Sequence, residues 1–496
     1  MRTPAWADLI VPLDIDLRSA LIAIDRNAQG IVFVCDEQRR LLGAISDGDA
    51  RRALVSGRSL DAPVHEVMNR DCVYCPVGAS PEDLLLRLGQ QGINHVPLVD
   101  DDHRVVDIAA ANRLRRIQVA SPDLRGNELL YVADCVKSGW VSSQGRYIRD
   151  FERLVAEFSG VPHAVAVSNG TVALHLALST LGIGRGDEVI VPDFTFAASV
   201  NAVLHTGATP VLVDVDRATW TIDVAEVTAA ITPRTRAVMP VHLYGQPCEM
   251  DVLTALAHTH HLWIVEDCAE AFGSRYKGAA VGSLGDAGAF SFYGNKTITT
   301  GEGGMVVFKD GELAERARRL RDHGMSTSRR YWHDEIGFNY RMTNMQGALG
   351  VAQMERAEQF LARKRLMSQA YDDGLAGLPG VERRAPVEWA ESVCWLYTFL
   401  LDGTAGISRD ALIGKLYQNG IESRPVFFPL HAMPPYSPLT GGRSYPVSTD
   451  LSRRGISLPS AVDLAPDDVA DVIAAVRGIL GVRQLVPESG FADPRT

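Results

Sequence analysis

Short, continuous apolar runs recur through most of the chain, from about residue 121 onwards. Each run is too short for a helix and lacks the polar alternation of a strand with one exposed face. Continuous apolar strands are typical of a sheet buried on both faces, and helical patterns separate these runs. The sequence therefore predicts an α/β fold with a mainly parallel sheet covered by helices. The predicted strands are residues 164–167, 188–191, 209–213, 237–241, 263–265, 288–292 and 304–308.

The pattern changes towards the end of the chain. The stretch after Leu349 is rich in helical patterns, and a smaller α/β unit follows from about residue 391. The clearest strand of this unit is predicted at residues 394–401. We therefore predict a large domain at 121–390 and a small C-terminal domain at 391–496.

An internal repeat occupies the first part of the chain, which we predict to be a separate domain at 1–120. Each copy has a strand, a polar turn, a second strand and a helix, and the copies lie about sixty residues apart. The predicted strands are residues 31–35 and 41–45 in the first copy and 96–99 and 104–108 in the second. A helix from Asp47 to Val55 follows the first copy, and apolar residues at helical spacing predict another helix within 62–70.

Composition and charge exclude several classes of function. The chain has 496 residues, of which 46% are hydrophobic and 22% charged, as in ordinary globular proteins. Its net charge of −11 argues against nucleic acid or an anionic membrane as a partner, because no basic surplus is available for phosphates. It has no signal-peptide pattern and no run of about 18 apolar residues. Seven irregularly spaced cysteines suit a reducing compartment, so we predict a cytoplasmic protein without a membrane span.

Two segments at predicted strand ends carry groups suited to binding a charged cofactor. Ser168–Thr171 precedes a helix, and the free amides of a helix N-terminus suit a phosphate, although these residues also form an ordinary N-cap. Asp267 and Glu270 follow a buried strand. A buried Asp is costly unless it meets a cation such as a protonated pyridinium nitrogen. The alternative role of this Asp is to cap the next helix.

Lys296 lies in a third segment, a glycine-rich loop that also contains three threonines. A lysine flanked by small and hydroxyl residues can be desolvated, and its amine can then form a Schiff base. A surface lysine is the alternative, but such a loop is not typical of a solvated charged face. A fourth segment, 337–344, directly precedes a predicted long helix.

Together these segments resemble the DegT/DnrJ/EryC1/StrS family of pyridoxal-phosphate (PLP) sugar aminotransferases, over about 370 residues. The run 291–304 reads Ser-Phe-Tyr-Gly-Asn-Lys-Thr-Ile-Thr-Thr-Gly-Glu-Gly-Gly, and the run 241–247 reads Val-His-Leu-Tyr-Gly-Gln-Pro. Both resemble the perosamine-synthase branch of the family most. The resemblance implies the type I, aspartate-aminotransferase-like fold and PLP as the cofactor.

The resemblance also implies roles for individual residues. Lys296 would hold PLP as a Schiff base and move a proton between the cofactor and the sugar carbon. Asp267 would pair with the pyridinium nitrogen. Glu270 would lie near the ring hydroxyl, where many relatives have Gln and the perosamine branch also has Glu. The other implied contacts are Gly170, Thr171 and Ser291 at the phosphate, Phe196 stacked on the ring, Asn339 at the phosphate of a neighbouring subunit, and Arg424 near the nucleotide sugar.

These roles imply an enzyme that transfers an amino group from glutamate to a 4-keto-6-deoxy nucleotide sugar, GDP-linked by its resemblance to perosamine synthases. Asn339 implies a homodimer, and a higher homo-oligomer stays open. Sugar dehydratases of the family carry His in place of the lysine, so Lys296 favours transamination. Two alternatives remain, namely a PLP-dependent sugar dehydratase and a nucleotide sensor with a degenerate PLP fold.

The N-terminal repeat resembles a tandem pair of cystathionine-β-synthase-type (CBS) domains, through residues 43–49 and 64–68. In that family, a hydroxyl residue and an Asp three residues later contact the ribose of an adenosyl nucleotide. This implies a regulatory adenine-nucleotide site at Ser46 and Asp49. The matching segment of the second copy, 107–113, has neither residue. The alternative is a structural or dimer-forming module.

No metal site is predicted from the sequence. Cys72 and Cys75 have the spacing of a zinc ligand pair, but no second pair follows at a suitable distance along the chain. His258, His260 and His261 lack the i, i+4 spacing of a helical metal site.

Overall fold

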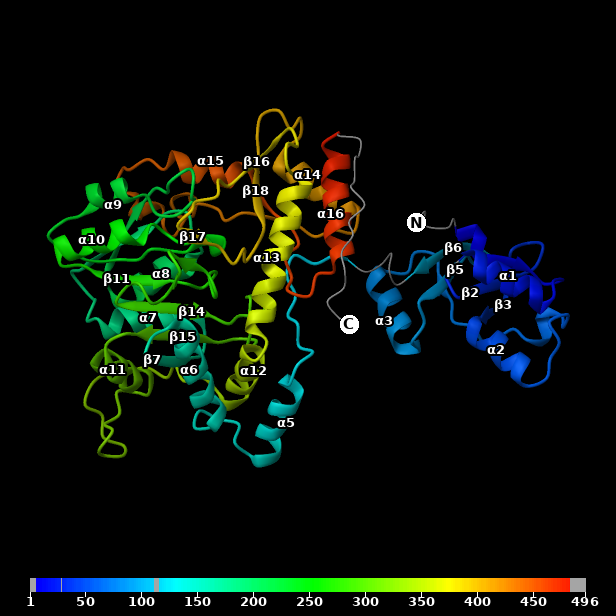
Figure 1. The fold of residues 1–496 in the computed structure, drawn as a ribbon, viewed down its shortest axis with the longest axis horizontal. Coiled ribbons are helices and arrows are strands. Elements are labelled where there is room, and N and C mark those ends of the chain that lie inside the picture. Colours follow the sequence, from blue (N-terminus) through cyan, green and yellow to red (C-terminus); the bar gives the residue numbers. More distant parts are fainter. Residues whose placement is uncertain (1–5, 28, 111–115, 482–496) are drawn as a thin grey trace. The chain divides into compact units, whose positions relative to one another are not determined.

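The computed structural model describes residues 6–27, 29–110 and 116–481, and its Cα positions separate the chain into two compact units, Met1–Arg116 and Ile117–Thr496 (Figure 1). In the described residues, no helix is both long enough and apolar enough to cross a membrane. All seven cysteines lie at described positions, and none of them forms a disulfide.

The first unit contains two three-stranded sheets with the same topology, which confirms the internal repeat. In each sheet, a short first strand pairs parallel with the middle strand, and the middle strand pairs antiparallel with the third. The first sheet consists of β1 (Ile10–Pro12), β2 (Ile31–Cys35) and β3 (Leu41–Ser46). The second consists of β4 (Cys75–Pro76), β5 (His95–Val99) and β6 (Val105–Ala110).

The helix predicted within residues 62–70 was wrong in extent. Only a short 3-10 helix, η2 (Val64–Glu66), forms there. The chain then turns into an extended pairing, because the amide of Asn69 donates to the carbonyl of Ala44 and the reverse bond also forms. The other helices of this unit are η1 (Trp6–Leu9), α1 (Leu17–Asn27), α2 (Asp47–Val55) and α3 (Pro81–Gln91). The helix implied after the second copy falls on 111–115, outside the described residues.

The second unit is built on a seven-stranded sheet, and each strand overlaps one of the seven predicted runs. The strand predicted at 237–241 instead begins at Thr235 and ends at Val238. The order across the sheet is β7-β15-β14-β11-β10-β8-β9. Only β15 runs antiparallel to its neighbours; the other pairings are parallel. The strands are β7 (His163–Val167), β8 (Glu188–Pro192), β9 (Thr209–Val213), β10 (Thr235–Val238), β11 (Trp263–Asp267), β14 (Ala287–Ser291) and β15 (Gly304–Phe308).

Helices cover both faces of this sheet, which explains why its strands are apolar on both sides. Alternate strand residues pack into different apolar clusters, so that Val165 and Val265 belong to one cluster whereas Ala166 and Ile264 belong to others. One face is covered by α7 (Gly170–Thr180), α8 (Ala197–Thr206) and α11 (Gly311–Arg321). The other is covered by α6 (Arg146–Ser159), α9 (Val224–Ala230), α10 (Met250–His260), α12 (Asn344–Met354) and α13 (Ala357–Gly374).

The C-terminal part forms a four-stranded antiparallel sheet of order β16-β18-β20-β19. Its clearest strand was predicted at 394–401, but β18 covers only Thr398–Leu401 because the chain bends at Cys394, which has a left-handed φ of 51°. The other strands are β16 (Val381–Arg383), β19 (Arg424–Pro425) and β20 (Gly455–Ser457). The helices of this part are α14 (Arg409–Gln418), α15 (Pro446–Arg454) and α16 (Pro466–Ile479).

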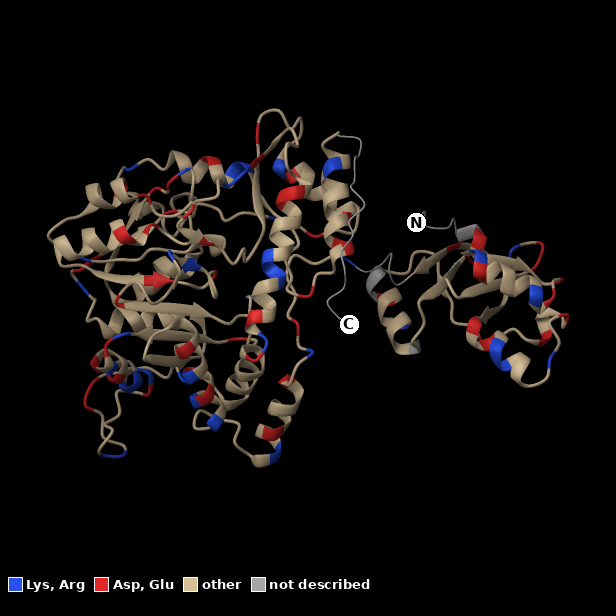
Figure 2. Cartoon of the chain, viewed as in Figure 1, with Lys and Arg blue, Asp and Glu red and all other residues tan. Residues whose placement is uncertain are grey.

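Short elements complete the second unit. Strands β12 (Arg275–Tyr276), β13 (Ala279–Ala280) and β17 (Ala390–Glu391) form a small antiparallel sheet, and α5 (Glu128–Ser138) precedes α6. Three 3-10 helices lie in loops, η3 (Leu243–Gly245), η4 (Leu430–Ala432) and η5 (Ser437–Thr440). Figure 2 shows charged residues mainly on helices and loops, whereas the central strands carry few of them. The acidic end of β11 is an exception, and it belongs to the candidate site.

Candidate active site

Asp267 is the last residue of β11, so its carboxylate lies at the carboxyl end of a buried strand of the central sheet. Its side chain is almost fully buried, with 4% of the residue exposed. Ser199 donates a hydrogen bond of 2.7 Å from its hydroxyl to Oδ2, and the amide of Ala269 donates one of 3.1 Å to Oδ1. Burial raises the pKa of Asp267, while these hydrogen bonds and the nearby Lys296 act in the opposite direction. This carboxylate is therefore stabilised best by a cation at the site.

Lys296 lies in the loop between β14 and β15, on the neighbouring strand of the same sheet edge. The loop is closed by backbone hydrogen bonds from Phe292 to Gly303, 2.8 Å, and from Thr300 to Phe292, 2.9 Å. Within the described residues, the amine of Lys296 makes no hydrogen bond and lies 3.9 Å from the ring centre of Trp395. Burial lowers the pKa of Lys296. A lower pKa gives more neutral amine, which is the nucleophilic form.

Glu270 lies one turn beyond Asp267 and is also buried. Its Oε2 accepts a hydrogen bond of 2.8 Å from the amide of Tyr244, a residue in the left-handed region with φ of 53°. Burial raises the pKa of Glu270 to about 7, against the opposing effect of Lys296. Glu270 can therefore gain or lose a proton near neutral pH, which an amide side chain such as Gln cannot do.

A cradle for an anion forms where α7 begins. Asn169 caps this helix by accepting the amide of Val172 at 3.0 Å, which leaves the first amides, those of Gly170 and Thr171, for another acceptor. A Cβ atom at position 170 would lie 2.7 Å from Cβ of Ser291 at the end of β14. Gly170 is therefore required for the close approach of these two segments. Amides at a helix N-terminus beside a serine hydroxyl suit a phosphate group.

Phe196 precedes α8 and is one of the exposed aromatic residues, with 60% exposure. Its ring lies 5.8 Å from the ring of Phe427, which comes from the C-terminal part of the unit. Ser199, three residues further along, contacts Asp267, so the start of α8 lies beside the buried carboxylate. This arrangement brings Phe196 to the site as an accessible aromatic face.

The structure places the last two predicted residues, Asn339 and Arg424, at exposed positions. Asn339 accepts a hydrogen bond of 3.2 Å from Arg341, close to the end of β7. Arg424 lies on β19, three residues before Phe427. Among the described residues, neither side chain forms a hydrogen bond or an ion pair with Lys296 or Asp267, so their implied contacts stay predictions.

Sequence reasoning missed several residues that shape the site. Ser199 was not singled out because a serine in a helix gives no local signal for a contact with a distant strand. Trp395 was predicted only as part of a strand. Tyr244 and Phe427 lay in runs that resemble the family, but no role in the site was predicted for them. The ring of Tyr244 lies nearly parallel to the rings of Trp395 and Phe427, at 6.1 and 5.3 Å. An aromatic cluster from distant segments thus borders Glu270 and Lys296.

A cluster of His242, Glu266 and Cys268 lies at the end of β11, next to Asp267, and its ligand-type atoms lie within 4.8 Å of one another. Nδ1 of His242 accepts the amide of Cys248 at 3.0 Å, so Nε2 carries the proton and donates to Glu266 at 3.0 Å. Glu266 also accepts the amides of Gly282, Leu284 and Gly285, at 2.8, 2.8 and 2.6 Å. These donors already use the lone pairs that a metal ion would need. The cluster is therefore a hydrogen-bonded support for β11.

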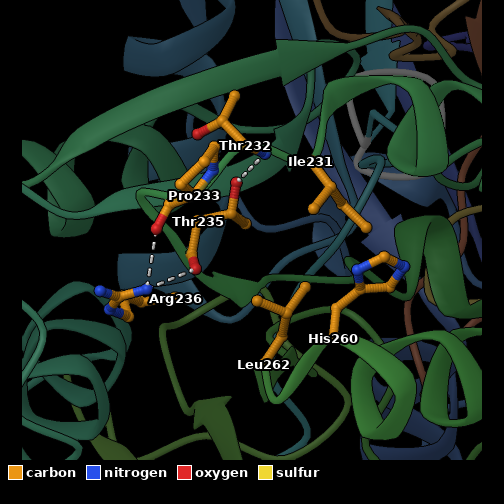
Figure 3. A pocket seen from close by; sticks show the side chains of 7 residues that line it. All are labelled: Ile231, Thr232, Pro233, Thr235, Arg236, His260 and Leu262. Carbon is orange, nitrogen blue, oxygen red and sulfur yellow. Dashed lines mark hydrogen bonds between the residues drawn. The ribbon is translucent and has the colours of Figure 1, made fainter.

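A shallow hollow occupies the opposite edge of the sheet, at the amino ends of β10 and β11 (Figure 3). Its one charged residue, Arg236, donates to the carbonyls of Pro233 and Thr235, at 3.1 and 3.2 Å. The predicted catalytic residues follow the carboxyl ends of the strands, so this hollow is separate from them.

Ser46 and Asp49 lie together at the start of α2 in the first unit. The hydroxyl of Ser46 donates to Asp49 at 2.7 Å, and the amides of both residues complete a capping box. Arg52 also pairs with Asp49, at 2.5 Å. These contacts explain both residues as a helix cap, and the nucleotide site stays a prediction.

Comparison with known proteins agrees with this geometry. A model of the DegT/DnrJ/EryC1/StrS aminotransferase family matches residues 122–477, and a CBS domain model matches residues 64–119. The chain belongs to the DegT/DnrJ/EryC1/StrS aminotransferase family. It is 49% identical over 368 residues to GDP-perosamine synthase of Caulobacter vibrioides, which covers 74% of this chain and 99% of that protein.

Two solved structures extend the comparison. DesV of S. venezuelae, in complex with a ketimine intermediate, has a TM-score of 0.68 and 39% identity over 72% of this chain and 95% of its own. Spr1654 of Streptococcus pneumoniae, in its PLP form, has a TM-score of 0.69 and 31% identity over 74% of this chain and 98% of its own. The cofactor of the family is therefore PLP, and the chain is a PLP-dependent aminotransferase.

The residues of this chain fit that cofactor. The cradle at Gly170 and Ser291 suits its phosphate, the buried Asp267 suits its ring nitrogen, and the amine of Lys296 lies nearby for covalent attachment. Bound PLP supplies an electron sink for charge that develops at the reacting carbon.

Proposed function

We propose that this enzyme aminates the C4 keto group of a GDP-linked 4-keto-6-deoxy sugar, with glutamate as the amino donor. The observation that carries the proposal is the arrangement of Lys296 beside two buried carboxylates, Asp267 and Glu270, at one sheet edge. The GDP-perosamine synthase of Caulobacter vibrioides, nearly half identical along almost its whole length, supports the choice of substrate. The residue ranges 121–390 and 391–496 are proposed as its large and small domains.

Each residue has a distinct task in the proposed reaction. Asp267 keeps the ring nitrogen of the cofactor protonated, helped by the hydroxyl of Ser199. Lys296 holds the cofactor before the reaction and then, as a free amine, carries a proton to or from the reacting carbon. Gly170, Thr171 and Ser291 hold the phosphate, and Phe196 covers one face of the ring. Arg424 is proposed to contact the nucleotide sugar.

The two alternatives predict different chemistry at the same residues. A sugar dehydratase would consume no glutamate, and the presence of Lys296 rather than His favours transamination. A nucleotide sensor with a degenerate PLP fold would not need Lys296 beside the buried carboxylate of Asp267. The intact hydrogen bonds around Asp267 support a working cofactor site.

We further propose that the enzyme is a homodimer and that Asn339 reaches the cofactor phosphate of the partner subunit. Large apolar side chains are exposed on and after α5, namely Leu129 at 82%, Leu130 at 64% and Trp140 at 58%. An exposed group of this kind is typical of a surface that another protein covers. A second copy of the chain would cover it and bring Asn339 to a neighbouring site.

For the first unit, we propose an adenine-nucleotide site at Ser46 and Asp49. The support is the CBS match and the position of both side chains at the N-terminus of α2. Titration of the full chain with ATP and AMP, read by calorimetry, tests this site. Binding that disappears in Asp49→Ala supports it, and the absence of any binding heat contradicts it.

The test of the main proposal is the visible absorbance of the purified protein before and after glutamate. We expect a yellow band that glutamate bleaches in the wild type, and no such band from covalent attachment in Lys296→Ala. Lys309→Ala is the matched control, because the amine of Lys309 is exposed and donates only to the carbonyl of Leu284. Product analysis with GDP-linked and UDP-linked keto-sugars then identifies the substrate. A wild type that cannot take up added PLP would overturn the proposal.

A further inference from the structure

Trp395 covers the amine of Lys296 although the two residues are about a hundred positions apart. The amine nitrogen lies 3.9 Å from the centre of the indole ring, over its face. The indole Nε1 donates a hydrogen bond of 2.8 Å to the carbonyl of Asn295, the residue just before the lysine. Trp395 itself is 5% exposed. One side chain therefore contacts both the lysine amine and the backbone from which the lysine extends.

The segment that carries Trp395 is locked in place by its surroundings. A Cβ atom at Gly245, where φ is 89°, would lie 2.9 Å from the amide nitrogen of Cys394, so only glycine permits this approach. Ser274 bridges the two segments, because its hydroxyl donates to the carbonyl of Gly245 at 2.6 Å and accepts the amide of Val393 at 3.0 Å. These contacts hold the bend that turns Trp395 towards the site.

A buried lysine, Lys364, also holds the backbone of the segment that carries Trp395. Lys364 is 3% exposed, and its amine donates to the carbonyl of Trp395 at 2.7 Å and to the carbonyl of Ser460. Burying an ammonium group against carbonyls alone is costly, and burial lowers the pKa of Lys364 to about 8. This buried amine therefore fixes the backbone of Trp395 although its burial is unfavourable.

The charged groups facing Lys296 are Asp267 and Glu270, from β11 and the turn after it. A third contribution comes from the indole, whose electron-rich face attracts an ammonium group. All three favour the charged amine, and burial opposes them. The indole differs from the carboxylates because it attracts the amine without accepting its proton.

We propose that Trp395 is a positioning residue that receives the free amine of Lys296 whenever this amine is not bound to the cofactor. The amine then stays within reach of the reacting carbon instead of swinging towards solvent. The inference rests on the proposed role of Lys296 as the cofactor-binding lysine. It adds a residue of the C-terminal segment to the proton-transfer machinery.

The lysine content of the chain makes a direct test practical. Only six lysines occur in the sequence, so peptide mapping can follow each amine separately. The full-length protein is loaded with pyridoxamine phosphate or left without cofactor, and is labelled with trace acetic anhydride across pH 6–11. The reactivity of Lys296 against pH gives the pKa of its amine without any turnover.

We expect the pKa of Lys296 to fall by about 0.5–1.5 units in Trp395→Leu, because a cation–π contact of ordinary strength is lost. Trp395→Phe keeps a weaker ring face and should give an intermediate value. For Trp395→Phe, we expect kcat to fall while KM for the sugar changes little. Trp389→Leu is the matched control, since Trp389 packs on Tyr276 and makes no ring contact with Lys296 among the described residues.

An unchanged pKa of Lys296 in Trp395→Leu would overturn the inference. If this variant does not fold, as judged by circular dichroism, the Phe variant decides, because a pKa equal to or above the wild-type value contradicts the proposal. The labelling needs no sugar substrate. The pKa of Lys296 can therefore be interpreted even if the proposed sugar amination is wrong. The role of Trp395 and the proposed function can each be contradicted without the other.

Discussion

The hydroxyl of Ser199 donates a 2.7 Å hydrogen bond to Oδ2 of Asp267, which joins the first turn of α8 to the end of β11. Both residues are buried, and Ser199 is only 1% exposed. A donor of this kind favours the charged form of a carboxylate and so offsets the effect of burial. Ser199 therefore keeps Asp267 available as the anionic partner of a protonated ring nitrogen.

Replacement of Ser199 by Ala should weaken PLP binding about tenfold or more. The reason is the loss of a hydrogen bond to a charged group, which is worth about 1.5–3 kcal/mol. The measurement is the Kd of PLP from an absorbance titration of cofactor-free protein. Ser283→Ala is the control, because its hydroxyl donates only to the carbonyl of Ala280. Equal affinity in Ser199→Ala and the wild type would contradict the role of this bond.

Glu270→Gln should remove a pH-dependent loss of stability. Burial raises the pKa of Glu270 from 4.5 to about 7, so the folded protein holds this proton more tightly than the unfolded chain. The stability conferred by the proton is complete below about pH 4.5 and is lost as the pH rises through 7. This rise in the pKa of Glu270 corresponds to roughly 3 kcal/mol of stability.

The comparison is made on cofactor-free protein by thermal unfolding between pH 5 and 8. Over this range, we expect the Tm of the wild type to fall relative to that of Glu270→Gln. Glu302→Gln, at an exposed carboxylate in the Lys296 loop, should follow the wild type. Parallel curves for all three proteins would show that Glu270 does not titrate in this range.

Two inactive variants should restore activity when they are mixed, if the site is shared between subunits. Lys296→Ala lacks the amine, and Asn339→Ala lacks the proposed contact to the partner's phosphate. In a mixed dimer, one of the two sites regains both residues, so random exchange should give about a quarter of wild-type activity. The measurement is turnover after the two purified proteins have been unfolded and refolded together. Activity no higher than that of either variant alone would exclude a shared site.

Glu266→Gln should destabilise the protein strongly without changing any group that contacts the cofactor. The carboxylate accepts four hydrogen bonds, from His242 and three backbone amides, and is fully buried. An amide in its place points donor to donor, and breaking such a buried pair costs about 3–5 kcal/mol.

Thermal unfolding measures this effect, and we expect Tm to fall by about 5–15 °C. Glu312→Gln, an exposed residue at the start of α11, is the control and should change Tm little. PLP should still bind to the folded variant at low temperature. A Tm within a degree of the wild type would show that the network around Glu266 contributes little.

The sequence alone determined the strands and the chemistry they carry. All seven strands of the central sheet were predicted because continuous apolar runs need no knowledge of neighbours. The repeat of the first unit was predicted because the same order of strands and turns recurs about sixty residues later. Lys296, Asp267 and Gly170 were singled out because each lies at or just after a strand end, and the resemblance of their segments to the family supplied their roles. The extent of the strand at 394–401 was not predicted, because the left-handed bend at Cys394 depends on contacts with distant residues.

Only the tertiary structure decided the strand order and the partners of the catalytic groups. The order places β14 beside β11, so Ser291 and Asp267 come to the same edge although the sequence separates them by a hairpin-like segment. Ser199, Tyr244 and Trp395 were missed for the same reason, since their contacts with Asp267, Glu270 and Lys296 are made across the fold. Local composition reveals which residue can do chemistry, whereas burial and long-range packing decide its charge and its neighbours.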